Sequence, residues 1–307
     1  MPADVARYTS ADEDSARWHG FPFRNGDIVI STRSKTGTTW VQMICALLIF
    51  QKPELEAPVG WYSPWLDRLT RPREEVVAQL EAQQHRRFIK THTPLDGIPV
   101  DARAIYLVVA RHPLDSAVSL YYQGENIDRE RQRRLVAETT GQPAALGREK
   151  PRKPVRDWLL DWIDNDASPH EEMDSIRGVL WHDSDAWARR SEPNIVLLHY
   201  ADLSADLEYQ MRQLADRLEI AVPEPTWPGL VQAATFASMR AAAEKISDEG
   251  QILKSAAAFF RRGVSGSGQE LLTAGELAHY YARAASLAPA DMLRWLHRPA
   301  LAGDACR

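Results

Sequence analysis

Ser31-Thr-Arg-Ser-Lys-Thr-Gly-Thr-Thr-Trp40 is the most informative stretch of this chain. It follows the apolar run Ile-Val-Ile at 28–30 and leads into an apolar helical pattern, Val41–Phe50. Gly37 lets the backbone approach a ligand closely, and Lys35 adds a mobile positive charge. The N–H groups of a first helical turn and the helix dipole also favour an anion. The stretch therefore predicts a strand, a phosphate-binding loop and a helix; the alternative is a threonine-capped helix without a ligand.

This loop differs from two common nucleotide loops. A Walker A loop places its lysine after the second glycine, whereas Lys35 precedes Gly37, the only glycine of the loop. A dinucleotide fingerprint needs three spaced glycines. No acidic residue at the end of a predicted strand offers itself as a magnesium partner. A small-molecule kinase of the P-loop type is therefore the weaker alternative.

Length and composition limit the classes of protein. A chain of 307 residues can bury a sizeable core, and we expect one α/β domain over 1–307. The net charge of −5 argues against a nucleic-acid partner. Cys45 and Cys306 are the only cysteines, which predicts neither a disulfide framework nor a cysteine metal site. The polar N-terminus and the shortness of the apolar runs predict a cytoplasmic protein without a membrane span.

Strand and helix patterns alternate along the chain, which predicts a parallel sheet with crossover helices. The predicted strands are Asp27–Ser31, Arg87–Thr91, Ala104–Ala110 and Ile195–His199. The predicted helices are Arg73–Gln84, Asp115–Tyr122, Val155–Asp164, Gly178–Arg190, Ala205–Leu218 and Gly275–Leu287. The segment 124–154 is polar and rich in arginine, glycine and proline, which predicts a mobile surface insertion whose charges are solvated or reach the nucleotide.

Three further segments carry residues suited to chemistry. Lys90 and His92 lie at the C-terminal end of a predicted strand, where open α/β sheets bind ligands, and a histidine can accept a proton near neutral pH. Arg111 and Ser119 follow the next strand and could hold a second anion, unless Arg111 only pairs with Asp115. The glycine-rich stretch Phe259–Gly268 contains two arginines, whose planar groups bind phosphate in a bidentate manner.

Together these segments resemble the cytosolic-type sulfotransferases that use 3′-phosphoadenosine 5′-phosphosulfate (PAPS) and release adenosine 3′,5′-bisphosphate (PAP). Residues 35–40 are similar to the family's Lys-Ser-Gly-Thr-Thr-Trp loop, and 90–94 to its Lys-Thr-His-x-Pro motif. Residues 109–119 resemble Val-x-Arg-Asn-Pro-x-Asp-x-Ala-Val-Ser, with His112 for asparagine. Residues 261–266 resemble Arg-Lys-Gly-x-x-Gly, although Ser267 and Gly268 replace the usual Asp-Trp. The resemblance implies a parallel α/β fold with a phosphate loop.

The resemblance also implies a role for each matching residue. His92 would be the catalytic base, and Lys35 and Lys90 would stabilise charge on the transferred group. The 5′-phosphate would contact Thr36, Gly37, Thr38 and Thr39, and the 3′-phosphate would contact Arg111, Ser119, Arg261, Arg262 and Gly263. The adenine would contact Trp40, Tyr200 and Phe236, with Thr235 taking the place of a threonine that is alanine at 234. No metal takes part in this scheme.

The sequence therefore predicts transfer of a sulfuryl group to a hydroxyl or amine of a small aromatic or lipophilic acceptor. An inactive nucleotide-binding module is the other alternative. Phe21, Phe23, Trp61, Tyr62, Trp65 and Leu66 are candidate walls of the acceptor pocket, or simply core residues. The family's C-terminal dimer motif is poorly matched by Gln269, Thr273-Ala274 and Ala278, so any homo-oligomer is expected to use other residues.

Overall fold

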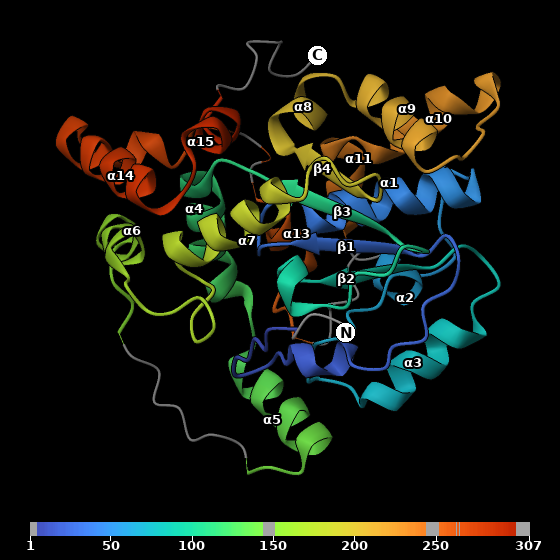
Figure 1. Ribbon diagram of the computed structural model, residues 1–307, viewed down its shortest axis with the longest axis horizontal. Helices are drawn as coiled ribbons and strands as arrows, with labels where there is room; N and C mark the ends of the chain where they lie inside the picture. The colour runs from blue at the N-terminus through green and yellow to red at the C-terminus, as the bar shows by residue number, and fades with distance from the viewer. Residues whose placement is uncertain (1–4, 144–150, 244–251, 262, 264, 299–307) are drawn as a thin grey trace.

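A parallel four-stranded sheet forms the centre of the molecule (Figure 1). The computed structural model describes residues 5–143, 151–243, 252–261, 263 and 265–298. The strands are β1 (Ile28–Thr32), β2 (Phe88–Thr91), β3 (Ile105–Ala110) and β4 (Ile195–His199), in the order β2-β1-β3-β4. All neighbouring pairs are parallel, so the carboxyl ends of the strands meet at one edge. The α/β fold and all four strands are confirmed, with starts that differ by one residue at most.

Side chains of each strand alternate between two apolar cores. Ile28 and Ile30 pack on one side of the sheet against α1 (Thr38–Phe50), together with residues of α9 (Leu207–Arg217) and α10 (Trp227–Ala234). Val29, between them, points to the other core. Both faces of the sheet are thereby covered, which explains why the strands are apolar throughout.

A third core lies beside the sheet. It is formed by residues of α4 (Pro113–Asn126), α6 (Val155–Asp164), α7 (Ile176–Ala188), α14 (Ala274–Leu287) and α15 (Ala290–Leu296). The other helices are α2 (Val59–Tyr62), α3 (Arg73–Ala82), α5 (Arg129–Thr140), α8 (Tyr200–Ala205), α11 (Phe236–Ala241) and α13 (Ala256–Phe259), with short 3₁₀ turns at Ser15–Trp18, Leu95–Gly97, Glu224–Thr226 and Gln269–Leu271.

The helix expected over Ala205–Leu218 is confirmed as α9, which begins two residues later because Asp206 leaves the helical conformation and its side chain caps the helix. In the segment 124–154, for which a mobile surface insertion is expected, residues 124–126 end α4 and Arg129–Thr140 form α5, capped by Asp128 and without a buried residue. Residues 144–150 lie outside the described residues. Helix α5 projects at the lower edge of Figure 1.

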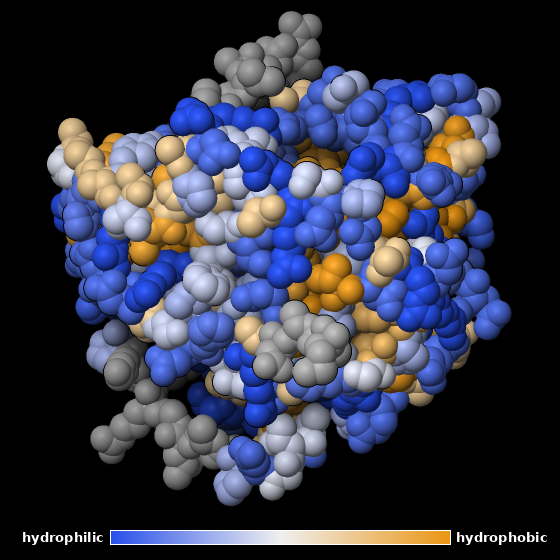
Figure 2. All heavy atoms as spheres, in the orientation of Figure 1, coloured by the Kyte–Doolittle hydropathy of each residue, from blue (hydrophilic) through white to orange (hydrophobic). Residues whose placement is uncertain are grey.

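The molecular surface is mainly hydrophilic on the face seen in Figure 2, with small separate apolar areas. Among the described residues, every helix is too short or too polar to cross a bilayer. The C-terminal residues compared with the dimer motif have contacts inside the chain: Thr273 forms a capping box with Glu276 at the start of α14, and Gln269 bonds to His112 and Tyr281.

Candidate active site

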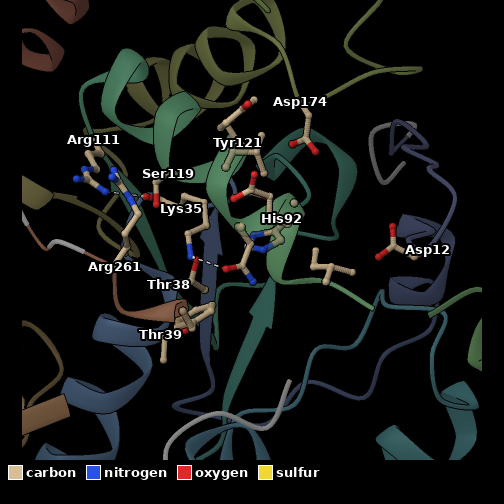
Figure 3. A pocket seen from close by; sticks show the side chains of 18 of the residues that line it. Asp12, Lys35, Thr38, Thr39, His92, Arg111, Ser119, Tyr121, Asp174 and Arg261 are labelled. Carbon is tan, nitrogen blue, oxygen red and sulfur yellow. Dashed lines mark hydrogen bonds between the residues drawn. The ribbon is translucent and has the colours of Figure 1, made fainter. Parts of the chain in front are cut away.

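A cavity of about 1080 Å³ lies at the carboxyl edge of the sheet. It brings together thirteen of the residues that the sequence singled out: Lys35, Gly37, Thr38, Thr39, Trp40, Lys90, His92, Arg111, Ser119, Tyr200, Phe236, Arg261 and Gly263. Figure 3 shows side chains of the phosphate loop, β2 and α4 converging on this space. Arg262 lies outside the described residues.

In the phosphate loop, the residues on either side of Thr36 both have left-handed backbone conformations. Lys35 has a φ of 69° and Gly37 a φ of 119°. A non-glycine residue in this region is strained, and such strain is concentrated at functional sites. The N–H and the hydroxyl of Thr36 both donate to the carbonyl of Arg33, at 3.3 and 2.8 Å. Thr36 therefore closes the turn through these two hydrogen bonds. Its side chain was expected to line the cavity, and it is not among the lining residues.

Lys35 and Arg111 are each held by an aromatic ring and a polar contact. Nζ of Lys35 lies 3.8 Å from the centre of the Phe259 ring and 3.5 Å from Oε1 of Gln123. The Arg111 guanidinium stacks at 4.1 Å over the Tyr200 ring and donates to the carbonyl of Lys35 at 3.3 Å. Two cations from different elements thus border one cavity, which suits a ligand with two anionic groups.

His92 has a defined tautomer. Its Nδ1 is within hydrogen-bonding distance of the carbonyl of Thr32, and a carbonyl can only accept, so Nδ1 carries the proton. The lone pair consequently lies on Nε2. Burial, together with the positive charges of Lys90 and Arg33, lowers the pKa of His92 well below its usual value. The imidazole is therefore neutral at physiological pH and able to accept a proton.

A tryptophan connects the two side chains of the β2 end. The Trp65 ring meets His92 edge to face at 4.5 Å, and Nζ of Lys90 lies 4.1 Å from its centre. Trp65 also pairs with Lys90 through a parallel backbone bridge. The segment before α3 thereby fixes both side chains against the cavity wall.

Asp67 holds the two residues that flank His92 through hydrogen bonds, a role that the sequence did not indicate. The hydroxyls of Thr91 and Thr93, which flank His92, both donate to Oδ2 of Asp67, at 2.5 and 2.6 Å. Asp67 is fully buried, and burial raises its pKa. No motif surrounds it in the sequence; the alternation Thr-His-Thr was the available signal, since alternate residues of a strand end share a face.

Among the described contacts, the carboxylate of Asp115 binds the glycine-rich loop and not the guanidinium of Arg111, which lies one helical turn earlier in sequence. Its Oδ2 accepts from the N–H of Gly266 at 2.8 Å, and its Oδ1 from the N–H of Gly268 at 3.0 Å and the hydroxyl of Ser267 at 3.3 Å. A Cβ on Gly268 would lie 2.5 Å from the Leu114 carbonyl. Ser267 and Gly268, where the family usually has Asp-Trp, thus dock the glycine-rich loop on the first turn of α4.

The aromatic residues predicted around an adenine form one group. Trp40 donates from its indole to the carbonyl of Ala234 at 2.8 Å and meets Tyr200 edge to face at 5.1 Å. Gly263 has a φ of 65°, and a Cβ there would lie 2.7 Å from the Phe236 ring. Thr235 differs from expectation: its hydroxyl bonds to Gln232 and caps α11 at Ser238, and the residue lies outside the cavity lining.

The cavity beyond His92 is unexpectedly polar. Asp12, Glu13, Glu172 and Asp174 line it. Asp174 accepts from Arg33 at 2.9 Å and Asp12 from Arg68 at 3.3 Å. Burial and the neighbouring Asp12 raise the pKa of Glu13 well above its usual range. Among the candidate wall residues, Trp65 lines this cavity, whereas Phe21, Phe23 and Leu66 are buried in the core of the second sheet face.

Comparison with known proteins shows the family of this chain. A family model described as the sulfotransferase domain matches residues 25–284. The chain is 42% identical to glycolipid sulfotransferases of Mycobacterium bovis and Mycobacterium tuberculosis, over 96% of this chain and 94% of theirs. The chain belongs to the sulfotransferase family and is a sulfotransferase.

Solved structures share the fold. Retinol dehydratase, in complex with androsterone and the inactive cofactor PAP, superimposes with a TM-score of 0.67 at 18% identity, covering 93% of this chain and 85% of the other. A mouse sulfotransferase complexed with PAP gives 0.66 at 16% identity, covering 96% and 94%. The predicted family and fold are thereby confirmed.

Proposed function

We propose that this enzyme transfers the sulfuryl group of PAPS to a hydroxyl on the carbohydrate headgroup of a glycolipid. The observation that carries the proposal is the state and position of His92. Its imidazole is neutral, with the proton on Nδ1, and it lines the same cavity as the cations suited to two phosphates and the carboxylates suited to sugar hydroxyls. Relatives with 42% identity are named glycolipid sulfotransferases, which supports the acceptor class.

The donor set fits a nucleotide with phosphates at two positions. Lys35 and the N-terminus of α1 would hold the 5′-phosphate, because they combine a cation with free N–H groups of a helix. Arg111, Ser119, Arg261 and Gly263 would hold the 3′-phosphate. Gly37, where an added Cβ would lie 3.2 Å from Tyr200, leaves room for close approach of the backbone. The rings of Trp40 and Phe236 offer flat faces on which the adenine of the nucleotide would stack.

The side chains of the site have complementary tasks. Nε2 of His92 would take the proton from the acceptor hydroxyl as its oxygen bonds to sulfur. Lys35 and Lys90 would stabilise the negative charge that develops on the leaving oxygen and the sulfuryl oxygens. PAPS, when bound, supplies the sulfuryl group and the leaving nucleotide. Positioning and aimed charge supply the rate acceleration in this scheme, and we propose that no metal takes part.

The polar end of the cavity favours a sugar over a phenol. Carboxylates accept hydrogen bonds from vicinal hydroxyls, and the raised pKa of Glu13 allows it to donate as well. Trp65 gives an apolar ring beside these groups, next to the catalytic histidine. Asp12 and Asp174 keep their contacts with Arg68 and Arg33, but a purely apolar acceptor would remove water from these carboxylates and from Glu13 without offering a hydrogen bond, which costs free energy.

Replacement of His92 tests the function. The H92A variant should lose ~10²–10⁴-fold in kcat/KM for sulfate transfer, since a general base contributes about this much, while PAP binds as in the wild type. Calorimetry with PAP and a transfer assay on methyl glucoside, galactoside and mannoside, with phenol for comparison, measure the two quantities. H279A, which removes an exposed histidine distant in sequence, is the control.

Retention of more than about a tenth of kcat/KM by H92A would show that His92 is not the base. The same assay run in EDTA separates the kinase alternative, which needs magnesium on its phosphates. Activity should persist in the chelator. A loss that magnesium restores would contradict the mechanism and favour phosphoryl transfer.

A further inference from the structure

Three consecutive residues at the end of β1 hold the end of β2. The hydroxyl of Ser31 donates to the carbonyl of Thr93 at 2.7 Å, and the carbonyl of Thr32 accepts from Nδ1 of His92. The guanidinium of Arg33 donates to the carbonyl of His92 at 2.7 Å. The two strands are parallel neighbours, so their ends lie side by side. The position of His92 therefore depends on the residues that lead into the phosphate loop.

Arg33 contacts three parts of the site at once. Its backbone carbonyl accepts the two hydrogen bonds from Thr36 that close the turn of the phosphate loop. One nitrogen of its guanidinium donates to the carbonyl of His92, and another donates to Oδ1 of Asp174 at 2.9 Å. A planar guanidinium can hold two acceptors in fixed directions, whereas a lysine ammonium is a mobile point charge. Arg33 therefore joins the phosphate loop, His92 and Asp174.

The Arg33 side chain is almost completely buried, whereas the carboxylate with which it pairs is not. The side chain of Arg33 is 5% exposed and that of Asp174 is 49% exposed. Asp174 lines the cavity, and Figure 3 shows it bordering the same space as His92. Because burial of a guanidinium costs desolvation that one ion pair need not repay, stability alone is a weak reason for this arrangement.

We propose that Arg33 is a positioning residue for sulfate transfer, which holds His92 at the end of β2 and Asp174 in the wall of the cavity. The inference rests on the proposed role of His92 as the base. It adds the residue that fixes the base relative to the phosphate loop and that supplies a positive charge beside it.

The charges around the imidazole predict different effects for the two members of the ion pair. The charged groups that face His92 or its neighbouring cations are Lys90 of β2, Arg33 after β1, Arg68 before α3, Asp12, Glu13 and Asp174. Burial lowers the pKa of His92, and the charges of Lys90 and Arg33 lower it further. Removal of the Arg33 charge should therefore raise this pKa. Removal of the Asp174 charge leaves Arg33 without its counter-charge and should not raise it.

The pH dependence of transfer to methyl glucoside tests the inference. In R33Q, the acid limb of kcat/KM should move to higher pH, because only the neutral imidazole accepts a proton. At the optimum pH, kcat should fall by about tenfold to hundredfold, since a displaced base reacts slowly. R33K keeps the cation but not the two fixed contacts, so it should restore the wild-type limb and only part of kcat.

Two further variants separate a positioning role from a structural one. D174N breaks the same ion pair but should leave the acid limb where it is or move it to lower pH. A role that consisted only of the ion pair would give R33Q and D174N the same effect. R189Q is the matched control, because it breaks another arginine–aspartate pair at the end of α7, outside the lining of the cavity. It should keep both the limb and kcat.

Nuclear magnetic resonance of the histidine ring nitrogens gives a readout that needs no acceptor. The H92N variant identifies the signals of His92 by their loss. The titration midpoint of His92 should be higher in R33Q than in wild type, and R33K and R189Q should titrate as wild type does. Where R33Q does not fold, the comparison of R33K with wild type decides the positioning role through kcat.

The outcomes separate this inference from the proposed function. An unchanged His92 midpoint in R33Q, an equal shift in R33K, or wild-type kcat in either variant overturns the role of Arg33, even if methyl glucoside accepts sulfate. A midpoint that rises in R33Q and returns in R33K supports that role even if no glycoside accepts sulfate, in which case the acceptor assignment fails by itself.

Discussion

Lys35 combines the charge that we propose for the reaction with a backbone conformation that a lysine does not favour. Its φ of 69° lies in the left-handed region, where a non-glycine residue costs ~1–2 kcal/mol. Its side chain is held between the Phe259 ring and Gln123. The protein therefore keeps a strained residue at the point where the leaving group is expected, a trade of stability for positioned charge.

The K35G variant should separate these two properties. Glycine adopts positive φ freely, so the free energy of unfolding should rise by about 0.5–1 kcal/mol after the greater chain entropy of glycine is counted. Sulfate transfer should fall at least about tenfold because the charge is lost. Thermal denaturation and kinetics measure the two. K52G, at an exposed position without positive φ, should gain no stability; a K35G variant less stable than wild type would contradict the strain argument.

Single residues also show where sequence reasoning succeeds and stops. Lys35, Lys90, His92 and Arg111 could be placed at one sheet edge because each lies at or just after the end of a strand, and parallel strands end together. Asp67 could not, since its contacts with Thr91 and Thr93 join residues 24 and 26 positions apart in a segment without a repeating pattern. Thr36 and Thr235 form hydrogen bonds within their own turns, and their contact with the ligand stays a prediction, since a threonine that caps a turn and one that binds phosphate look alike in sequence.

Helix α4 organises the part of the cavity where we propose that the nucleotide binds. Asp115 in its first turn holds the N–H groups of Gly266 and Gly268, and Ser119, one turn later, lines the cavity. The glycine-rich loop is therefore anchored at its C-terminal end, while Arg261 and Gly263 lie at its cavity end. The sequence predicted the helix and the loop. It did not predict that Asp115 joins them, because Arg111 is the nearer candidate partner of Asp115 in sequence.

The D115N variant tests this anchor. An asparagine presents an NH₂ group to one of the loop N–H groups, so at least one charge-assisted bond worth about 1.5–3 kcal/mol is lost. Amide exchange of the 265–268 peptide should accelerate, and PAP affinity should fall about tenfold because the loop must be ordered on binding. D157N, in the exposed first turn of α6, is the control. Unchanged exchange in D115N would show that the contact with Asp115 does not hold the loop.

At the scale of the whole molecule, several buried histidines have neutral imidazoles in the folded state. Burial lowers the pKa of His199 and His297 to about 4 and also lowers the pKa of His112. The three rings lie where α4, β4 and the C-terminal helices meet; His112 and His297 have ring centres 5.0 Å apart. In the unfolded chain these groups take up protons near pH 6.5, so the unfolded state binds more protons between pH 6.5 and about 4.

Stability should accordingly fall as the pH falls from 6.5 towards 4. The H112N variant isolates one contribution, since asparagine can still cap α4. Its thermal stability relative to wild type should improve progressively as the pH is lowered through this window, as measured by calorimetry from pH 7 to 4.5. H279N, which replaces an exposed histidine, should run parallel to wild type. A constant difference between H112N and wild type would mean that His112 is not neutral in the fold.

Phe259 belongs to the walls of the active-site cavity and of a second cavity of about 340 Å³, and its ring also packs under Nζ of Lys35. One aromatic ring thus borders the place expected for a nucleotide phosphate and a neighbouring cavity. A ligand that moves this ring in one cavity changes a surface of the other, and thermodynamic linkage is reciprocal. The factor by which an occupant of the second cavity changes the affinity for PAP must therefore equal the factor by which PAP changes the affinity for that occupant.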